Sequence, residues 1–152
     1  MTRTNMARLI LGGIVAGIVL NILGYIVDGV LLGSQWNAGM AALGKGGIST
    51  SQIVGFNILG LANGIFVVWL YAAIRPRYGA GPKTAACAGL ALWVAGVLLP
   101  NVSFMGVNGL FDTNLTILTT VAGIVECIFA ALAGAAVYKE GAESAQTMAA
   151  RA

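Results

Sequence analysis

Glu126 is the residue best placed for chemistry, because it is a carboxylic acid in the middle of a long apolar stretch. It lies 11 residues beyond Leu115, where that stretch begins, or about 17 Å along a helix. An acid at mid-depth in a bilayer costs on the order of 2.5–3.5 kcal/mol, and the apolar stretches contain neither Lys nor Arg to pair with it. We therefore expect a neutral carboxyl group, or one compensated by water, a bound cation or a basic group of another protein.

Four asparagines fall inside the other apolar stretches, and they are Asn21, Asn57, Asn63 and Asn101. Asn21 and Asn63 lie within about two helical turns of the depth of Glu126, and Asn101 lies somewhat further outward. Side-chain amides inside a bilayer seek hydrogen bonds with neighbouring helices. The spacing therefore predicts a polar cluster of Glu126, Asn21 and Asn63, with Asn101 as a fourth member. Such a cluster can stabilise the helix bundle, bind a proton, an ion or a small ligand, or dock a partner.

Asp28 is the second acid, and it lies near the outer end of the first apolar stretch. One interpretation is a solvated carboxylate at the membrane boundary. The other is a vestibule that leads toward Asn21, about two turns deeper on the same helical face.

Residue types that support catalysis are scarce. The chain has no histidine, its two cysteines are isolated, and it contains no phosphate-binding loop and no dinucleotide fingerprint. An enzyme site would bring several titratable groups to one depth, whereas Glu126 stands nearly alone. We predict no catalytic residues, no metal site and no cofactor.

The polar residues must be positioned by membrane-spanning helices. Hydrophobic residues make up 59% of the sequence and charged residues 9%, and four apolar stretches each exceed the roughly 20 residues that cross a bilayer. These stretches cover 9–32, 52–74, 85–107 and 115–138. The predicted fold is an all-α membrane protein with a four-transmembrane-helix bundle as its single domain, 1–140, followed by a cytoplasmic tail, 141–152.

The basic residues predict the orientation of this bundle. Only Lys45 falls in a connection on one side of the membrane. The other basic residues all fall on the opposite side, and they are Arg3, Arg8, Arg75, Arg77, Lys83, Lys139 and Arg151. An excess of Lys and Arg marks the cytoplasmic face, so we expect both termini in the cytoplasm. The first apolar stretch is too long for a cleaved secretory signal.

The first outer connection carries a helical pattern of its own. Trp36, Met40 and Leu43 share one helical face. Ser34 is placed to cap this helix and Gly44 to end it. The pattern predicts a short interfacial helix with its tryptophan at headgroup depth.

The remaining connections predict tight turns. Pro76 is expected to end the second span and Thr84 to cap the third. The very short connection near Asp112 makes spans three and four antiparallel neighbours. Pro100 and Asn101 predict a kink within span three.

Small residues recur along the spans and predict close helix packing. The packing glycines are Gly13, Gly17, Gly24, Gly60, Gly64 and Gly123. A weak repeat also relates Asn21 and Asp28 to Asn101 and Asn108. It is consistent with two parallel hairpins, and chance similarity between apolar helices is the alternative.

Two segments, Asp28–Trp36 and Trp69–Thr84, resemble a family of small bacterial four-span membrane proteins with no assigned activity. In layout the chain is also similar to the DUF1761 family, although it lacks the Trp-Tyr-Ser-Pro segment typical of that family. The resemblance implies a multi-pass protein of the bacterial cytoplasmic (inner) membrane and carries no functional residues.

Two functions remain open from the sequence. The first is a non-enzymatic integral membrane protein whose partners are the lipid bilayer and either further copies of itself or other membrane subunits, with no role for nucleic acid. The alternative is a proton- or cation-coupled carrier or channel that uses the Glu/Asn cluster.

Overall fold

The computed structural model describes residues 5–138, and their regular structure is entirely helical. Four of its helices are long and apolar enough to cross a membrane: Met6–Leu31, Thr50–Tyr78, Pro82–Phe104 and Thr113–Val137. The predicted all-α fold with four spans is confirmed. The predicted tail, 141–152, lies outside the described residues.

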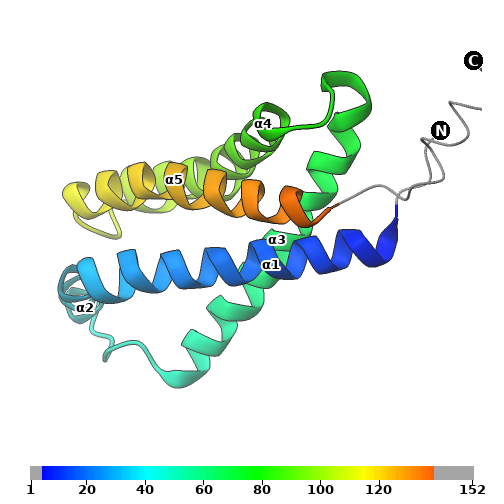
Figure 1. Ribbon diagram of the computed structural model, residues 1–152. Coiled ribbons are helices and arrows are strands. Elements are labelled where there is room, and N and C mark those ends of the chain that lie inside the picture. Colours follow the sequence, from blue (N-terminus) through cyan, green and yellow to red (C-terminus); the bar gives the residue numbers. More distant parts are fainter. Residues whose placement is uncertain (1–4, 139–152) are drawn as a thin grey trace, which may run out of the picture.

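Each span is built from the elements labelled in Figure 1, with some π-helical segments between them. A π-helical segment is wound more widely than an α-helix, with hydrogen bonds from residue i to i+5. In chain order the elements are α1 (Met6–Gly24), η1 (Tyr25–Leu31), α2 (Gly33–Ala42), α3 (Thr50–Tyr78), α4 (Pro82–Trp93), η2 (Val94–Leu98), η3 (Asn101–Val107) and α5 (Thr113–Val137).

Side-chain caps fix the starts of three long helices. The Asn5 side chain accepts a hydrogen bond from the third residue into α1. Ser49 and Gln52 form a reciprocal capping box at the start of α3. Asp112 accepts from Asn114 N at 2.8 Å at the start of α5. Each cap satisfies backbone N–H groups that a helix start leaves unpaired.

The turn between α3 and α4 differs from the prediction. Pro76 lies inside α3, which continues to Tyr78. A proline in the last turn removes a single hydrogen bond, so the helix can continue past it. Gly79, with φ +83°, follows the end of the helix. Thr84 does not cap α4, because Pro82 already occupies its first turn and the threonine hydroxyl donates to the Gly79 carbonyl at 2.8 Å.

The short helix of the first outer connection is present as α2. Ser34 does not cap it, since the helix already begins at Gly33 and the N-cap position belongs to Leu32. Gly44 ends it with φ +69°, and its N–H donates to the Ala41 carbonyl at 2.9 Å. This geometry is a Schellman motif, which favours glycine because a Cβ atom is strained at positive φ.

Span three departs from α-helical winding around Pro100, the residue for which the sequence predicts a kink. The π-helical segments η2 and η3 lie on either side of it, and the Leu99 N–H donates five residues back, to Val94. Proline cannot supply the backbone donor that an α-helix needs there, and wider winding re-pairs the carbonyls around it.

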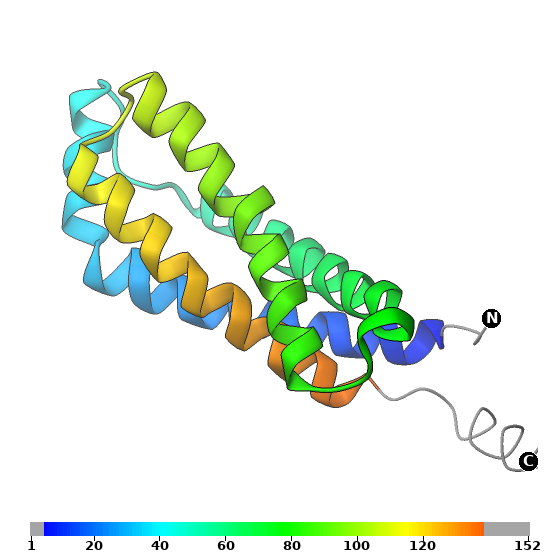
Figure 2. The same cartoon turned by 90° about the horizontal axis from the view of Figure 1, so that it is seen from above.

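The helices form a bundle in which α1 packs mainly against α3 and α5, while α4 packs against α5 and α3. Figures 1 and 2 show α1 and α5 side by side along the bundle. The start of α1 and the end of α5 lie at the same end, together with the α3–α4 turn. The opposite end carries α2 and the start of α5. We call it the outer end, after the orientation that the sequence predicts.

Glycines allow the closest approach, which is between α1 and α3. A Cβ atom on Gly13 would lie 2.6 Å from the Cα atom of Ile65, and one on Gly17 would lie 3.0 Å from the Gly60 carbonyl oxygen. A Cβ atom on Gly64 would collide with backbone atoms of both α1 glycines. Small residues at these positions let the two backbones touch, as is typical of membrane helices.

Other glycines serve the remaining helix pairs. A Cβ atom on Gly12 would lie 2.7 Å from the Gly134 carbonyl oxygen, where α1 meets α5. Gly89 lies against a backbone carbonyl of α5, and Gly123 lies against the side chains of Trp93 in α4 and Val97 in η2. Gly24 has no such neighbour within 4 Å, so the structure gives it no part in close packing.

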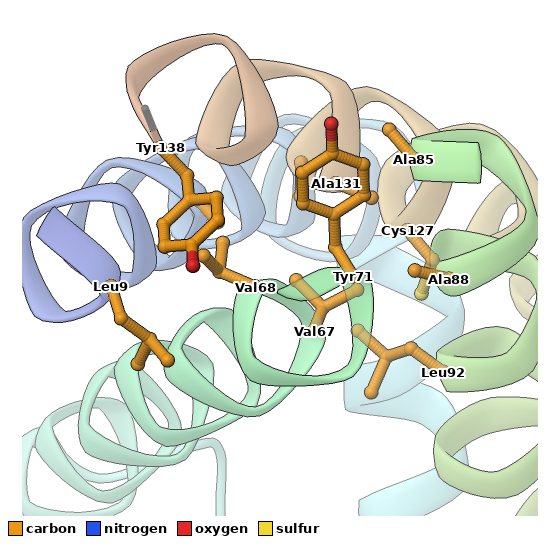
Figure 3. Packing of buried hydrophobic residues seen from close by; sticks show 12 residues of the cluster. Leu9, Val67, Val68, Tyr71, Ala85, Ala88, Leu92, Cys127, Ala131 and Tyr138 are labelled. Atoms are coloured by element: carbon orange, nitrogen blue, oxygen red, sulfur yellow. The ribbon is translucent and has the colours of Figure 1, made fainter. Parts of the chain in front are cut away.

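The buried core lies in the half of the bundle opposite to the outer end. Figure 3 shows its members converging from α1, α3, α4 and α5. The Tyr71 and Tyr138 rings pack edge to face, with their centroids 6.1 Å apart. The other cluster members are Leu9, Ala16, Val67, Val68, Ala85, Ala88, Leu92, Cys127, Ala130 and Ala131. The outer half contains few buried side chains, and the first half of α3 diverges from the other helices (Figure 1).

Candidate functional site

Glu126 lies at the centre of α5, one residue before the buried Cys127. Its side chain is half-buried at the edge of the face that α5 turns to the core. Its carboxyl group makes no hydrogen bond and no ion pair with any residue in the described range, 5–138. It is a desolvated acid whose polar atoms remain available to a ligand or a partner.

Asn21 lies at about the depth of Glu126 but faces another helix. Gly12 of α1 lies against Gly134 of the antiparallel helix α5, and this contact fixes their register. Leu20 lies eight residues after Gly12 and Glu126 lies eight residues before Gly134, so these two residues are at about the same depth. The Asn21 amide instead donates to the Asn57 carbonyl of α3 at 3.1 Å. Asn21 therefore joins α1 to α3, and within residues 5–138 no hydrogen bond connects it to Glu126.

Asn63 lies on the outside of the bundle. The sequence places it in a cluster with Glu126, whereas the structure exposes its side chain and gives it no hydrogen bond within the described residues. Its neighbour Gly64 occupies the face that packs against α1. Adjacent helical residues differ by about 100° in direction, so Asn63 points away from the bundle and the predicted three-residue cluster does not form.

Asn101 joins η3 to α5 through hydroxyl groups. Its Nδ2 atom lies 3.2 Å from Thr119 Oγ1 and 2.9 Å from Thr120 Oγ1. The Trp93 indole donates to the Thr120 carbonyl at 2.7 Å. Sequence reasoning missed the two threonines because a hydroxyl in a helix can bond its own backbone, as Thr119 also does. The sequence could still have indicated this contact, because only one short connection separates the segment of Asn101 from the helix of the two threonines.

Asp28 is held at the outer end of the bundle by α2. Its Oδ1 atom accepts a hydrogen bond from the Trp36 indole at 3.0 Å. The Trp36 ring packs edge to face on Phe111 at 5.1 Å, and Phe111 also fills the space beside Gly39. The short helix thus bridges the end of span one and the connection between spans three and four.

The other end of the bundle contains a small apolar cavity of about 190 Å³. Its lining includes Tyr71, Ala85 and Leu132, and the tyrosine hydroxyl is its only polar side-chain group. That hydroxyl accepts a hydrogen bond from Gly81 N at 3.2 Å. Ligand pockets are typically larger and carry several convergent polar groups, so this cavity is not a good candidate site.

Within residues 5–138, no three His, Cys, Asp or Glu side chains are grouped to hold a metal ion. The four long apolar helices define the class of the molecule, a multi-pass membrane protein. Comparison with protein-family models, with curated proteins and with solved structures finds no match to the chain.

Proposed function

We propose that the chain is a non-enzymatic integral membrane protein that works inside a membrane assembly, either a small homo-oligomer or a larger complex that it joins as an accessory subunit. The observation that carries this proposal is the divergence of the first half of α3 from the bundle (Figure 1). Its exposed apolar side chains include Ile53, Val54, Phe56, Ile58 and Leu59.

A diverging membrane helix offers a surface for association. Helices in lipid associate through van der Waals packing and interhelical hydrogen bonds. Along the first half of α3 the described chain supplies them only toward α1, at positions such as Asn57 and Gly60, and the other faces of this segment are exposed. A neighbouring subunit can supply such contacts there without disturbing the core, which lies in the other half of the bundle.

We place this assembly in a bacterial inner membrane, with both termini in the cytoplasm. Arg8, Arg75, Arg77 and Lys83 all lie at the end of the bundle where α1 starts and α5 ends, and basic residues mark the cytoplasmic side. The resemblance to small bacterial membrane proteins supports the same location.

Intact-complex mass spectrometry of the tagged protein, released from its native membrane under mild conditions, tests the proposal. We expect masses of a homo-oligomer or of a complex with other subunits. A monomer at every protein concentration and in several mild detergents would overturn it. Extraction in a harsh detergent provides the monomer reference.

A second candidate function is a proton- or cation-coupled carrier or channel. It is favoured by Glu126, which is half-buried and makes no hydrogen bond with the part of the chain that the structure describes. Thr119, which binds Asn101, lies seven residues further outward on α5, or about 10 Å. Asp28 belongs to η1, which also contacts α5. Acids and hydroxyls thus occur at successive depths between the outer end and the middle of the bundle.

Proteoliposomes with a pH or sodium gradient test this second candidate. We expect the wild-type protein to dissipate one of the gradients and Glu126→Gln to abolish the flux while the protein stays folded. Asp112→Asn is the matched control, because that acid is exposed and caps α5. Wild-type vesicles as tight as empty ones would contradict a carrier or channel.

A further inference from the structure

The diverging helix α3 carries an ordered seam that the fold leaves largely exposed. Residues spaced alternately by three and four positions lie on one face of α3, and this outer α3 seam consists of Gln52, Phe56, Leu59, Asn63, Phe66, Leu70 and Ala73. All are exposed except Leu70, which is half-buried. The same spacing, repeated over several heptads, is the pattern with which two parallel helices pair.

The bundle occupies a different face of α3. Gly64 lies against α1, Val67 and Val68 are fully buried, and Tyr71 belongs to the core. None of these residues belongs to the outer α3 seam. Among the seam residues only Leu70 also packs, partly buried, against the core. The rest of the seam can therefore receive a second helix while the helix contacts within the chain stay in place.

Asn63 distinguishes the seam from an ordinary lipid-facing surface. It is the midpoint of the apolar stretch 52–74, and its amide makes no hydrogen bond with the described residues. By contrast, the exposed amide of Asn57 donates to the Ile53 carbonyl of its own helix at 2.8 Å. Acyl chains offer neither donors nor acceptors, so an unpaired amide at mid-depth is costly.

A second copy of the same chain is the partner that best satisfies this amide. A carboxamide both donates and accepts hydrogen bonds, so two copies of Asn63 can satisfy each other across a twofold axis. All copies insert with the same orientation, so their α3 helices run parallel. A residue at the first hydrophobic position of a heptad then faces its own copy, where a lone Asn fixes the register.

We propose that the protein forms a parallel homodimer through the outer α3 seam, with paired Asn63 amides at its centre and a twofold axis along the membrane normal. The proposal rests on the proposed function, for which it names the partner and the surface. The seam residue Phe66 stacks on Trp69, with ring centroids 5.8 Å apart, and Trp69 flanks the seam on one side.

Disulfide cross-linking in native membranes tests the geometry. Leu59 lies on the seam and Ile58 does not, although their side chains are exposed to the same degree, 59% and 61%. In a Cys87→Ala background we expect oxidation to cross-link Leu59→Cys and Phe66→Cys into dimers, because a disulfide needs Cα atoms within about 7 Å. We expect Ile58→Cys to stay monomeric.

Dimerisation strength tests the role of the amide. We expect Asn63→Leu to weaken the dimer by about three- to thirtyfold, the range found for one polar interhelical contact in a membrane. Asn57→Leu is the matched control and should leave the dimer unchanged, because that side chain bonds only to its own helix. Förster transfer between labelled subunits, diluted with lipid in vesicles, measures both.

The outcomes separate this inference from the proposed function. Cross-links at Ile58→Cys but not at Leu59→Cys, or a dimer indifferent to Asn63→Leu, would overturn the seam while leaving a homo-oligomer. A complex with other subunits and one copy of this chain would also overturn the seam and would keep the proposed function. A monomer under all conditions would overturn both.

Discussion

The crossing of α1 and α3 makes the sharpest prediction about stability, and Gly64→Ala is the change that tests it. A Cβ atom at this position would lie 2.5 Å from the Gly17 Cα atom and would also collide with the backbone of Gly13. Nonbonded carbon atoms prefer about 3.5–4.0 Å, so α1 and α3 must separate by about 1 Å. Backbone atoms cannot rotate away as the end of a side chain can, so the two helices must move apart at their crossing.

The expected cost follows from a comparison of two glycines in the same helix. Overpacking costs about 1–3 kcal/mol. In the interior of a helix, by contrast, alanine is more stabilising than glycine by about 1 kcal/mol. Gly55 has no neighbouring atom within 4 Å of its would-be Cβ atom. The propensity gain is therefore shared by Gly55→Ala and Gly64→Ala, and we expect the second variant to be less stable than the first by about 1–3 kcal/mol.

Reversible unfolding in mixed micelles, followed by circular dichroism as dodecyl sulfate is added, measures this difference in the free energy of unfolding. Gly17→Ala together with Gly64→Ala should cost less than the sum of the single changes, since helices already separated by one methyl group accommodate a second more easily. Equal stability of Gly64→Ala and Gly55→Ala would refute the close crossing. A fully additive double variant would contradict a shared contact.

Three further changes test other parts of the fold. Asn101→Leu removes the amide that η3 places on two threonine hydroxyls of α5, and we expect a loss of about 0.6–1.7 kcal/mol in the same unfolding assay. Gly44→Ala forces a Cβ atom into positive φ, which should cost about 1 kcal/mol and should speed hydrogen exchange at the end of α2. Trp36→Phe removes the hydrogen bond to Asp28; we expect faster exchange throughout α2, and unchanged exchange would show that the bond does not hold this helix in place.

The depth of each polar residue was predictable from the sequence, but its direction was not. A rise of 1.5 Å per residue places Asn21, Asn63 and Glu126 near mid-membrane whatever their neighbours are. Which neighbour each one faces depends on the rotation of its helix, and that is set by the close contacts. Because Gly64 must face α1, its neighbour Asn63 cannot also point inward.

Helix ends were predictable at some positions only. Gly44 ends α2 as its type predicts, since a positive φ depends on few residues, whereas Ser34 and Thr84 do not cap their helices. Pro76 was misjudged because its effect depends on position: in the middle of a helix it disrupts a turn, whereas near the end it removes one bond. The π-helical winding of η1 had no clear signal in the sequence.

The two halves of the bundle are held together by different interactions, and this division bears on function. The half near the termini is joined by close packing around a buried core. The outer half depends more on a few hydrogen bonds, such as Asn21 to Asn57 and the Trp36 indole to Asp28. Polar contacts of this kind contribute about 0.6 kcal/mol each on average in membranes, so the outer half can change its contacts at low cost. Glu126 and Asn63, which make no hydrogen bond with another residue in the range 5–138, both lie at the border of that half. We expect a second subunit or a cation to bind there without unfolding the core.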